Sequence, residues 1–274
     1  MISTLEAILI GFVGAVTQIL PISASAHQHL VQSITGWVQT DSITSVIYTC
    51  VSLALFIYYR HDWASIIASI FRVLLTFSKP MTIDERMPFF LVLSSAPPIL
   101  IDHFELLPDF TSNIKPYWIA ALLAVFTLPI FLAERMNRRN KCYLDWSFMD
   151  AIMVGIAQLT VFIPGAGRHF GFYTGAFFQN FQMEAAVKYS FLSFTPWLVY
   201  RAICMFPDSV TPIDSAFGMS PLSFGFMIIV TFFTATLTIG GFNRQVLKSG
   251  LTRYTIYRFL VAGTIYGLYW YQNR

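Results

Sequence analysis

Two short polar stretches each follow an apolar run of the chain. Each carries residue types that can bind phosphate or take part in phosphoryl transfer. The first, at 21–27, reads PISASAH, and the second, at 164–169, reads PGAGRH. Arg168 offers a planar guanidinium whose N–H donors suit the oxygens of a phosphate group. His27 has a side chain that can serve as a nucleophile or as a general acid–base. If the fold brings the stretches together, they favour phosphate binding or phosphoryl transfer.

Small residues surround Arg168, so backbone N–H groups can approach an anion beside it. We therefore predict His27 and Arg168 as catalytic residues. The predicted substrate-binding residues are either polar or small enough to expose the backbone: Gln18, Ser25, Gly165, Gly167 and His169.

Structural alternatives stay open for these residues. Arg168 could pair with backbone carbonyls or with a buried acid, although neither polar stretch holds an acid placed for it. His27 could be a core histidine, which is the interpretation given to His29 and His103.

The composition indicates an integral membrane protein. Of 274 residues, 56% are hydrophobic and 11% are charged, whereas a soluble domain has roughly 25% charged residues. Apolar runs near the roughly 20 residues needed to cross a bilayer recur from end to end. The net charge of +3 is too small to indicate nucleic-acid binding. Cys50, Cys142 and Cys204 are too widely spaced to indicate a disulfide framework or a zinc site.

The sequence repeats itself weakly. Residues 6–11 (EAILIG) resemble residues 150–155 (DAIMVG), and each segment lies upstream of one polar stretch. Internal duplication with broken helices is typical of inverted-repeat membrane proteins. We predict a single membrane domain built of two inverted repeats, 1–140 and 141–274.

We expect an all-α fold with six transmembrane helices and two re-entrant helical hairpins. Each hairpin contains one polar stretch, because an interrupted helix at membrane depth must be buried in protein or line a cavity. The hairpins are predicted at 4–37 and 147–182, with an interfacial helix at 63–77. The spans are predicted at 43–59, 88–102, 117–133, 185–206, 221–240 and 255–271.

Charge asymmetry between the loops predicts their orientation. The loops at 60–87, 134–146 and 243–254 hold eleven lysines and arginines, whereas those at 37–43, 102–116 and 206–220 hold only Lys115. By the positive-inside rule the basic loops are cytoplasmic and both termini face outward. Each half has an odd number of spans, so the second half is inverted and the hairpins meet near the membrane centre. This arrangement would bring His27 and Arg168 to one site.

Two acids near the hairpins have a structural explanation. Ser3 with Glu6, and Ser147 with Asp150, have the spacing of capping boxes, so we predict helix caps instead of catalytic acids. The segment before residues 24–26 resembles a cleavable leader. No lysine or arginine precedes Arg60, however, so we expect the segment to be retained.

Three motifs resemble those of the undecaprenyl-diphosphate phosphatases, also called bacitracin-resistance phosphatases. They are Pro21-x-Ser23-x-x-x-His27, Pro164-Gly165-x-x-Arg168 and Ile256-Tyr257-Arg258-Phe259, and the resemblance covers nearly the whole chain. It implies an enzyme of the bacterial inner membrane that removes the terminal phosphate from a polyprenyl diphosphate, the lipid carrier of cell-wall synthesis. The implied site opens to the periplasm, and the implied partners are that lipid and the membrane. Through the first motif the resemblance implies that Ser23 is a third catalytic residue beside His27 and Arg168.

The chain departs from the family pattern at several positions. Family glutamates are replaced by Gly14 and Gln18, and a proposed catalytic serine by Ala24. Two further serines and a threonine are replaced by Gly167, His169 and Phe172. The resemblance implies a divalent cation, Mg²⁺ or Ca²⁺, held by carboxylates. Because Gly14 and Gln18 offer none, we assign no metal ligands.

Two functions of different classes follow. The first is hydrolysis of a polyprenyl diphosphate to the monophosphate. The second is a non-catalytic binder or flippase of the same fold, which would tolerate loss of the acids while keeping Arg168; a transporter of a small anion is a third interpretation. Phosphate release from polyprenyl diphosphate distinguishes the first from the others.

Overall fold

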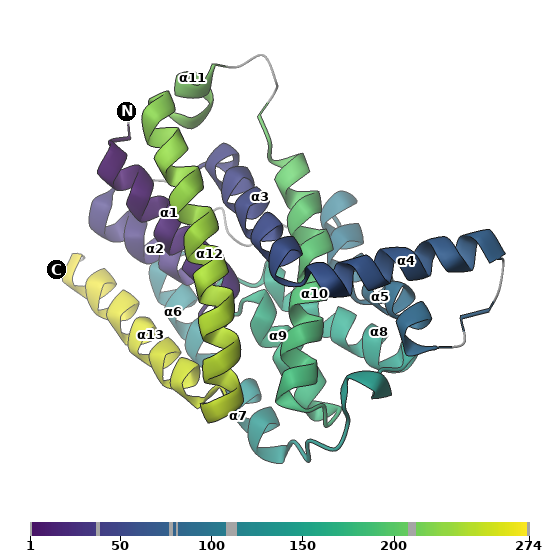
Figure 1. Cartoon of the computed structure of the whole chain (residues 1–274). Helices are drawn as coiled ribbons and strands as arrows, with labels where there is room; N and C mark the ends of the chain where they lie inside the picture. Colours follow the sequence, from purple (N-terminus) through teal and green to yellow (C-terminus); the bar gives the residue numbers. More distant parts are fainter. Residues whose placement is uncertain are drawn as a thin grey trace.

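The computed structural model describes residues 2–36, 39–76, 79–80, 82–107, 114–207 and 212–272. Their regular structure is helical, with isolated β-bridges in place of any strand ladder. The all-α prediction is confirmed at this level. Figure 1 shows α3 (Asp41–Tyr58), α10 (Met183–Cys204) and α12 (Pro221–Ser249) running through the bundle, with α3 in contact with both of the others.

Each polar stretch interrupts a helix. In the first half, α1 (Thr4–Ile19) ends ahead of Pro21, and α2 (Ala24–Thr35) follows. In the second half, α8 (Phe148–Ala157) and the 3₁₀ turn η2 (Gln158–Phe162) precede Pro164, and α9 (Arg168–Phe178) follows. Proline has no N–H to continue a helix, which explains why both breaks occur where the sequence predicts them.

Six helical stretches correspond to the predicted spans, with shifted ends. Of these, α3, the pair α6 (Pro116–Val125) and α7 (Thr127–Met136), and α12 are long and apolar enough to cross a membrane. The others, α5 (Ile83–His103), α10 and α13 (Thr252–Gln272), have 21, 22 and 21 residues but are less uniformly apolar. The described residues therefore show three clear spans, and the count of six stays a prediction.

The remaining helices are peripheral. α4 (Arg60–Thr76), which overlaps the predicted interfacial helix, crosses the outside of the bundle in Figure 1. Short turns at η1 (Tyr143–Asp145) and α11 (Ile213–Phe217) connect the longer elements.

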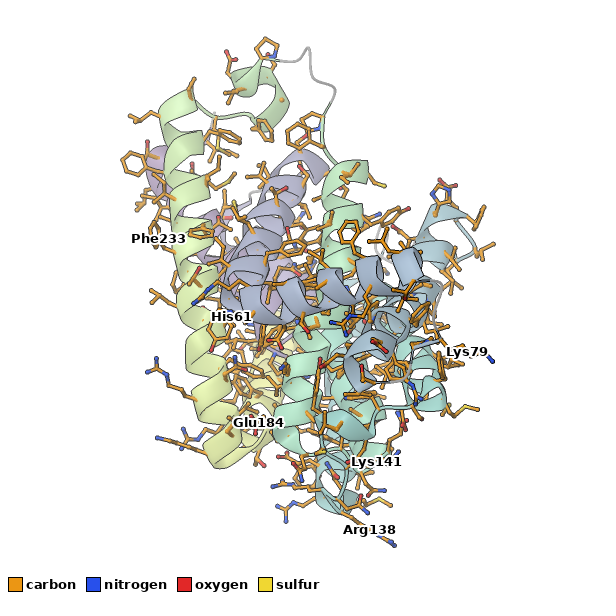
Figure 2. All side chains as sticks on the ribbon, turned by 45° about the vertical axis from the view of Figure 1, so that its right-hand side comes forward. His61, Lys79, Arg138, Lys141, Glu184 and Phe233 are labelled. Atoms are coloured by element: carbon orange, nitrogen blue, oxygen red, sulfur yellow. The ribbon has the colours of Figure 1, made fainter. Side chains whose placement is uncertain are left out.

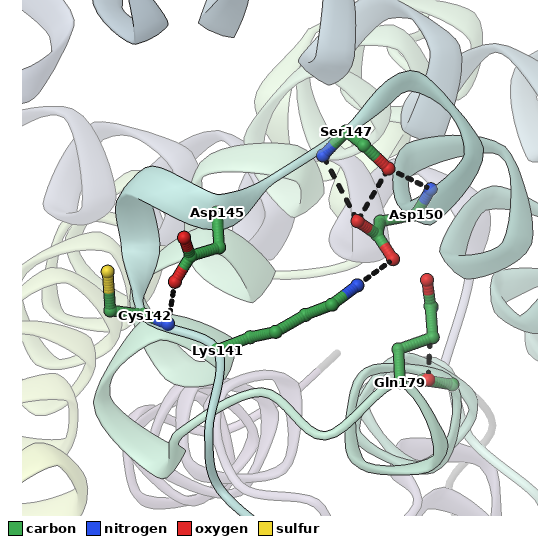
Figure 3. A network of polar contacts seen from close by, with 7 residues as sticks. Lys141, Cys142, Asp145, Ser147, Asp150 and Gln179 are labelled. Atoms are coloured by element: carbon green, nitrogen blue, oxygen red, sulfur yellow. Dashed lines mark hydrogen bonds and ion pairs between the residues drawn. The ribbon is translucent and has the colours of Figure 1, made fainter.

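Both predicted capping boxes are present. Ser3 and Glu6 form one at the start of α1. Ser147 and Asp150 form the other at the start of α8, where the Ser147 hydroxyl donates to Asp150 at 2.6 Å. The second oxygen of Asp150 receives the Lys141 ammonium at 2.8 Å (Figure 3). Both acids therefore have the partners expected of helix caps.

Helices of one half pack on helices of the other. α1 lies against α12, and α8 lies against α5. α3 packs on α10, and α6 packs on α13. In the predicted repeat α1 corresponds to α8, and α5 corresponds to α12. The contact of α1 with α12 is then equivalent to the contact of α8 with α5. The halves are therefore interlocked, and both contribute to the main hydrophobic core and to a smaller one between α2, α6 and α13.

The outer face of α12 is apolar. Large side chains that are 42–75% exposed follow one another at helical spacing, and Figure 2 shows Phe233 pointing outward: Leu222, Phe226, Ile229, Phe233 and Leu237. Such a row would be unfavourable in water and is what a lipid-facing helix presents. Arg138 and Lys141, from the basic loop 134–146, lie together at one end of the bundle.

Candidate functional site

A polar cavity of about 750 Å³ lies where the two interrupted helices meet. The first turn of α2, with Ser23 and Ser25, forms one wall, and the first turn of α9, with Arg168, forms another. Side chains from other helices complete the lining: Gln18, Tyr48, Asp102, Trp197, Arg201 and Arg258. One polar stretch from each half thus contributes to a single site.

The two loops touch directly. The Gly165 N–H donates to the Ser25 hydroxyl at 3.0 Å, and Gly167 lies against the backbone of Ser23. Ser23 and Gly167 have φ values of 72° and 80°, in the region that favours glycine. Ser23 adopts this conformation as the N-cap of α2, where its hydroxyl accepts the Ala26 N–H at 3.4 Å.

Arg258, on α13, ties both loops together. Its Nη2 donates to the carbonyl oxygens of Gly165 at 3.0 Å and Ala166 at 2.9 Å. Its Nη1 donates to the carbonyl oxygen of Pro21 at 3.4 Å, and its Nε to the Thr127 hydroxyl at 2.8 Å. Arg258 is 1% exposed. All four of these partners are neutral. The positive charge of Arg258 is therefore buried beside the loops without a negative charge among its hydrogen-bond partners.

Arg168 lies in the cavity wall, where neutral groups also hold it. Its Nε and Nη2 both donate to Oε1 of Gln158 at 2.9 Å, and Nη2 donates to the Ser193 carbonyl at 3.2 Å. The guanidinium lies over the rings of Phe194 and Trp197, at 4.4 and 4.6 Å from their centroids. Within the described part of the chain, no carboxylate forms a salt bridge with it.

Three nitrogen atoms of cavity-lining residues have no hydrogen-bond partner among the described residues. They are Nη1 of Arg168, Nε1 of Trp197 and Nε2 of His29. A buried polar group without a partner costs roughly 1–3 kcal/mol, so these atoms call for a ligand. The N-termini of α2 and α9 add partial positive charge at the same cavity. The Arg168 and Trp197 N–H groups and the helix N-termini favour an anion, whereas Nε2 of His29 can either donate or accept a hydrogen bond.

α2 presents His29 to the cavity and turns His27 away from it. Ser25 and His29 are one helical turn apart and both line the cavity. His27 lies on another face of the helix, and its Nδ1 donates to the Ser23 carbonyl at 2.8 Å. In the neutral ring, Nε2 then accepts the Tyr257 hydroxyl at 2.8 Å. His27 is not among the described cavity-lining residues, and its catalytic role stays a prediction.

The other predicted binding residues have different surroundings. Gln18 and His169 line the cavity. His169 already has protein partners at both ring nitrogens, because Nε2 donates to the Gln18 carbonyl at 2.9 Å and Nδ1 accepts the Ser190 hydroxyl at 3.0 Å. Gly165 uses its N–H on Ser25 instead of exposing it. His169 and Gly165 thus hold the walls of the cavity in place.

Comparison with known proteins identifies the family. Residues 7–264 match the family described as bacitracin resistance protein BacA. The chain belongs to this family. It is 32% identical over 266 residues to undecaprenyl-diphosphatase 1 of Shouchella clausii, covering 95% of this chain and 94% of the relative. Proteins named undecaprenyl-diphosphatase from Chlorobaculum parvum and Thermobifida fusca are 30% identical over 200 residues and 27% identical over 271 residues. These matches cover 70% and 97% of this chain, and 71% and 90% of the relatives.

The divalent cation that the sequence resemblance implied does not fit this donor set. Gly14 and Gln18 provide no carboxylate. Three acids line the cavity, namely Asp41, Asp102 and Glu105, and Asp102 is already paired with Arg201 at 2.9 Å. Over the described ranges, His, Cys, Asp and Glu side chains form no cluster of three or more that could hold a metal. The lining is mixed in charge, because Arg168, Arg201 and Arg258 stand beside these acids, and the unpartnered N–H groups of Arg168 and Trp197 favour an anion.

Sequence reasoning missed Arg258, Gln158 and His29 as residues of the site. Arg258 lies in the family motif 256–259, and an arginine within an apolar helix is itself a functional signal. Gln158 has no such signal, because its importance comes from holding Arg168 and donating to the Ser94 carbonyl at 2.9 Å.

Arg258→Lys should destabilise the protein, because one ammonium group cannot reach both loops and Thr127 together. We expect a loss of roughly 1–3 kcal/mol in the free energy of unfolding, measured as a lower thermal midpoint of the purified protein in detergent. Arg253→Lys changes an exposed arginine on the same helix and should leave the midpoint unchanged. Equal midpoints for both variants would mean that other contacts hold the loops.

Proposed function

We propose that this chain hydrolyses undecaprenyl diphosphate, or a closely related polyprenyl diphosphate, to the monophosphate. Family membership and the names of the relatives support this activity. The observation that carries it is Arg168, a buried cation in the cavity wall with no described carboxylate partner and an unpartnered Nη1. The reaction would regenerate the lipid carrier of cell-wall synthesis in the bacterial inner membrane.

The reaction consumes a water molecule. The water oxygen bonds to the terminal phosphorus while the bond from that phosphorus to the bridging oxygen breaks. The bridging oxygen stays on the polyprenyl monophosphate, and inorganic phosphate leaves. Charge on the phosphoryl oxygens must be stabilised by donors already in place. In our proposal Arg168, the Trp197 N–H and the N-termini of α2 and α9 supply them.

An imidazole is the best available group to accept the proton of the attacking water. We place His29 in this role, because its Nε2 has no described partner and the residue lines the cavity. His27 is the second candidate, since its Nε2 would first have to release the Tyr257 hydroxyl.

We also propose a specific membrane arrangement: six spans, two re-entrant hairpins, inverted repeats 1–140 and 141–274, and both termini on the periplasmic side. The contact of α1 with α12 is equivalent to that of α8 with α5, which supports the inverted repeat. The position of Arg138 and Lys141 at one end of the bundle supports a single cytoplasmic face (Figure 2).

The purified protein should release inorganic phosphate from undecaprenyl diphosphate, with or without a chelator. Arg168→Lys should lower kcat/KM by roughly 100-fold, because a point charge cannot replace a planar donor group. Arg244→Lys, at an exposed arginine of α12, should retain full activity. If the protein binds the lipid and releases no phosphate, it is a non-catalytic binder or flippase, which the replacements at Gly14, Gln18 and Ala24 would allow.

His29→Gln should lower kcat by at least about 100-fold while leaving lipid binding largely intact, because a general base acts on the chemical step. His27→Gln should reduce kcat less, by under about tenfold. The test measures kcat from phosphate release, and the affinity for the lipid, for both variants. The reverse order would assign the proton transfer to His27.

Labelling of the native cysteines tests which loops face the periplasm and which face the cytoplasm. A variant keeping only Cys204, at the exposed end of α10, should react with a membrane-impermeant maleimide on intact cells. A variant keeping only Cys142, in the basic loop, should react only after permeabilisation. Labelling of Cys142 alone on intact cells would invert the proposed topology.

A further inference from the structure

A second cavity, of about 510 Å³, lies outside the polar site between α4, α5 and α10. α4 lines it at helical spacing with Trp63, Ile66 and Ile70, and α5 faces it with Val92 and Ala96. Apart from Ser95, the described lining residues are all hydrophobic. The space therefore suits a hydrocarbon chain and offers almost nothing to a polar ligand.

The apolar cavity borders the polar cavity across the contact between α5 and α10. On α5, Leu100 lines the apolar space, whereas the next residues, Ile101 and Asp102, line the polar one. On α10, Pro196 lines the apolar space and Trp197 the polar one. The polar cavity and the apolar cavity are thus lined by neighbouring residues of the same two helices.

Both helices contain proline at this border. α5 contains Pro97 and Pro98, and α10 contains Pro196. A proline inside a helix removes a backbone hydrogen bond and favours a kink, so both helices lack backbone hydrogen bonds at this border. Nearby, Arg201 donates to both oxygens of Asp102 at 3.0 and 2.9 Å and joins the two helices.

We propose that the apolar cavity binds the first isoprene units of the substrate tail while the diphosphate occupies the polar cavity, with the chain passing between α5 and α10. This inference rests on the proposed function, because only a long lipid with a charged head needs both spaces at once. An acyl chain of the surrounding bilayer is the competing occupant. It would fit the apolar walls but would have no relation to the anion site.

The cavity acts mainly by directing the tail. The bilayer interior is as apolar as the cavity, so moving a hydrocarbon between them yields little hydrophobic free energy. Close packing against α4 and α5 contributes van der Waals contact and fixes the direction in which the tail leaves the head group. The diphosphate is then held towards Arg168 instead of sampling many orientations.

Ala96→Trp, which fills the cavity, tests the proposal with two substrates. For undecaprenyl diphosphate we expect KM to rise by roughly fivefold or more with kcat little changed. For dimethylallyl diphosphate, whose single isoprene unit is too short to fill the cavity, KM should not change. Leu237→Trp, on the lipid-facing side of α12 at 75% exposure, is the control and should affect neither substrate. An unchanged KM for the long substrate would overturn the proposal.

Photolabelling provides a readout that does not need turnover. A polyprenyl diphosphate with a diazirine in its first isoprene units should label peptides from 63–74 and 88–100, and undecaprenyl phosphate should compete. Labelling confined to other helices, or labelling insensitive to competitor, would overturn the proposal even if Ala96→Trp fails to fold. If these peptides are labelled while no substrate is hydrolysed, the tail site stands and the proposed hydrolysis fails.

Discussion

The Arg258 guanidinium is the group on which the geometry of the site depends. Its N–H groups reach the Pro21 carbonyl in one half of the chain and the Gly165 and Ala166 carbonyls in the other. These carbonyls lie in helix breaks, where regular helical partners are missing. A polar backbone group left unpaired inside a membrane protein is strongly unfavourable. One side chain therefore satisfies both breaks and sets the distance between them.

Because Arg258 holds the two loops together, the N-termini of α2 and α9 both lie at the polar cavity. Arg168 is fixed there by Gln158, whose amide oxygen orients the guanidinium without cancelling its charge. A carboxylate in that place would hold Arg168 as firmly but would compete with a phosphate for it. The positive charge of Arg168 thus stays available to an anion in the cavity.

The interlocking of the halves also places spaces of opposite character side by side. α5 packs on α8 and α10, so it forms one boundary of the polar cavity and, on another face, part of the apolar one. A lipid with a charged head and an apolar tail requires this combination. Neither half of the chain alone contains both walls, because α5 lies in residues 1–140 and α10 in residues 141–274.

The sequence by itself determined the features that depend on neighbouring residues. Apolar composition indicated the membrane, Pro21 and Pro164 marked the helix breaks, and the Ser147–Asp150 spacing predicted a capping box that is present. Each of these has a local cause: a missing N–H, a short polar side chain, or a run of hydrophobic residues.

Only the tertiary structure decided which groups face the cavity. His27 and His29 are two residues apart, which turns them by roughly 200° around α2. The contact of His27 with Tyr257 on α13 leaves His29 towards the cavity, and no local pattern specifies that choice. The partners of Arg258 lie 92 to 237 residues away in the chain. Its role follows from the way α13 packs across both loops, which depends on the whole bundle and not on the residues around it.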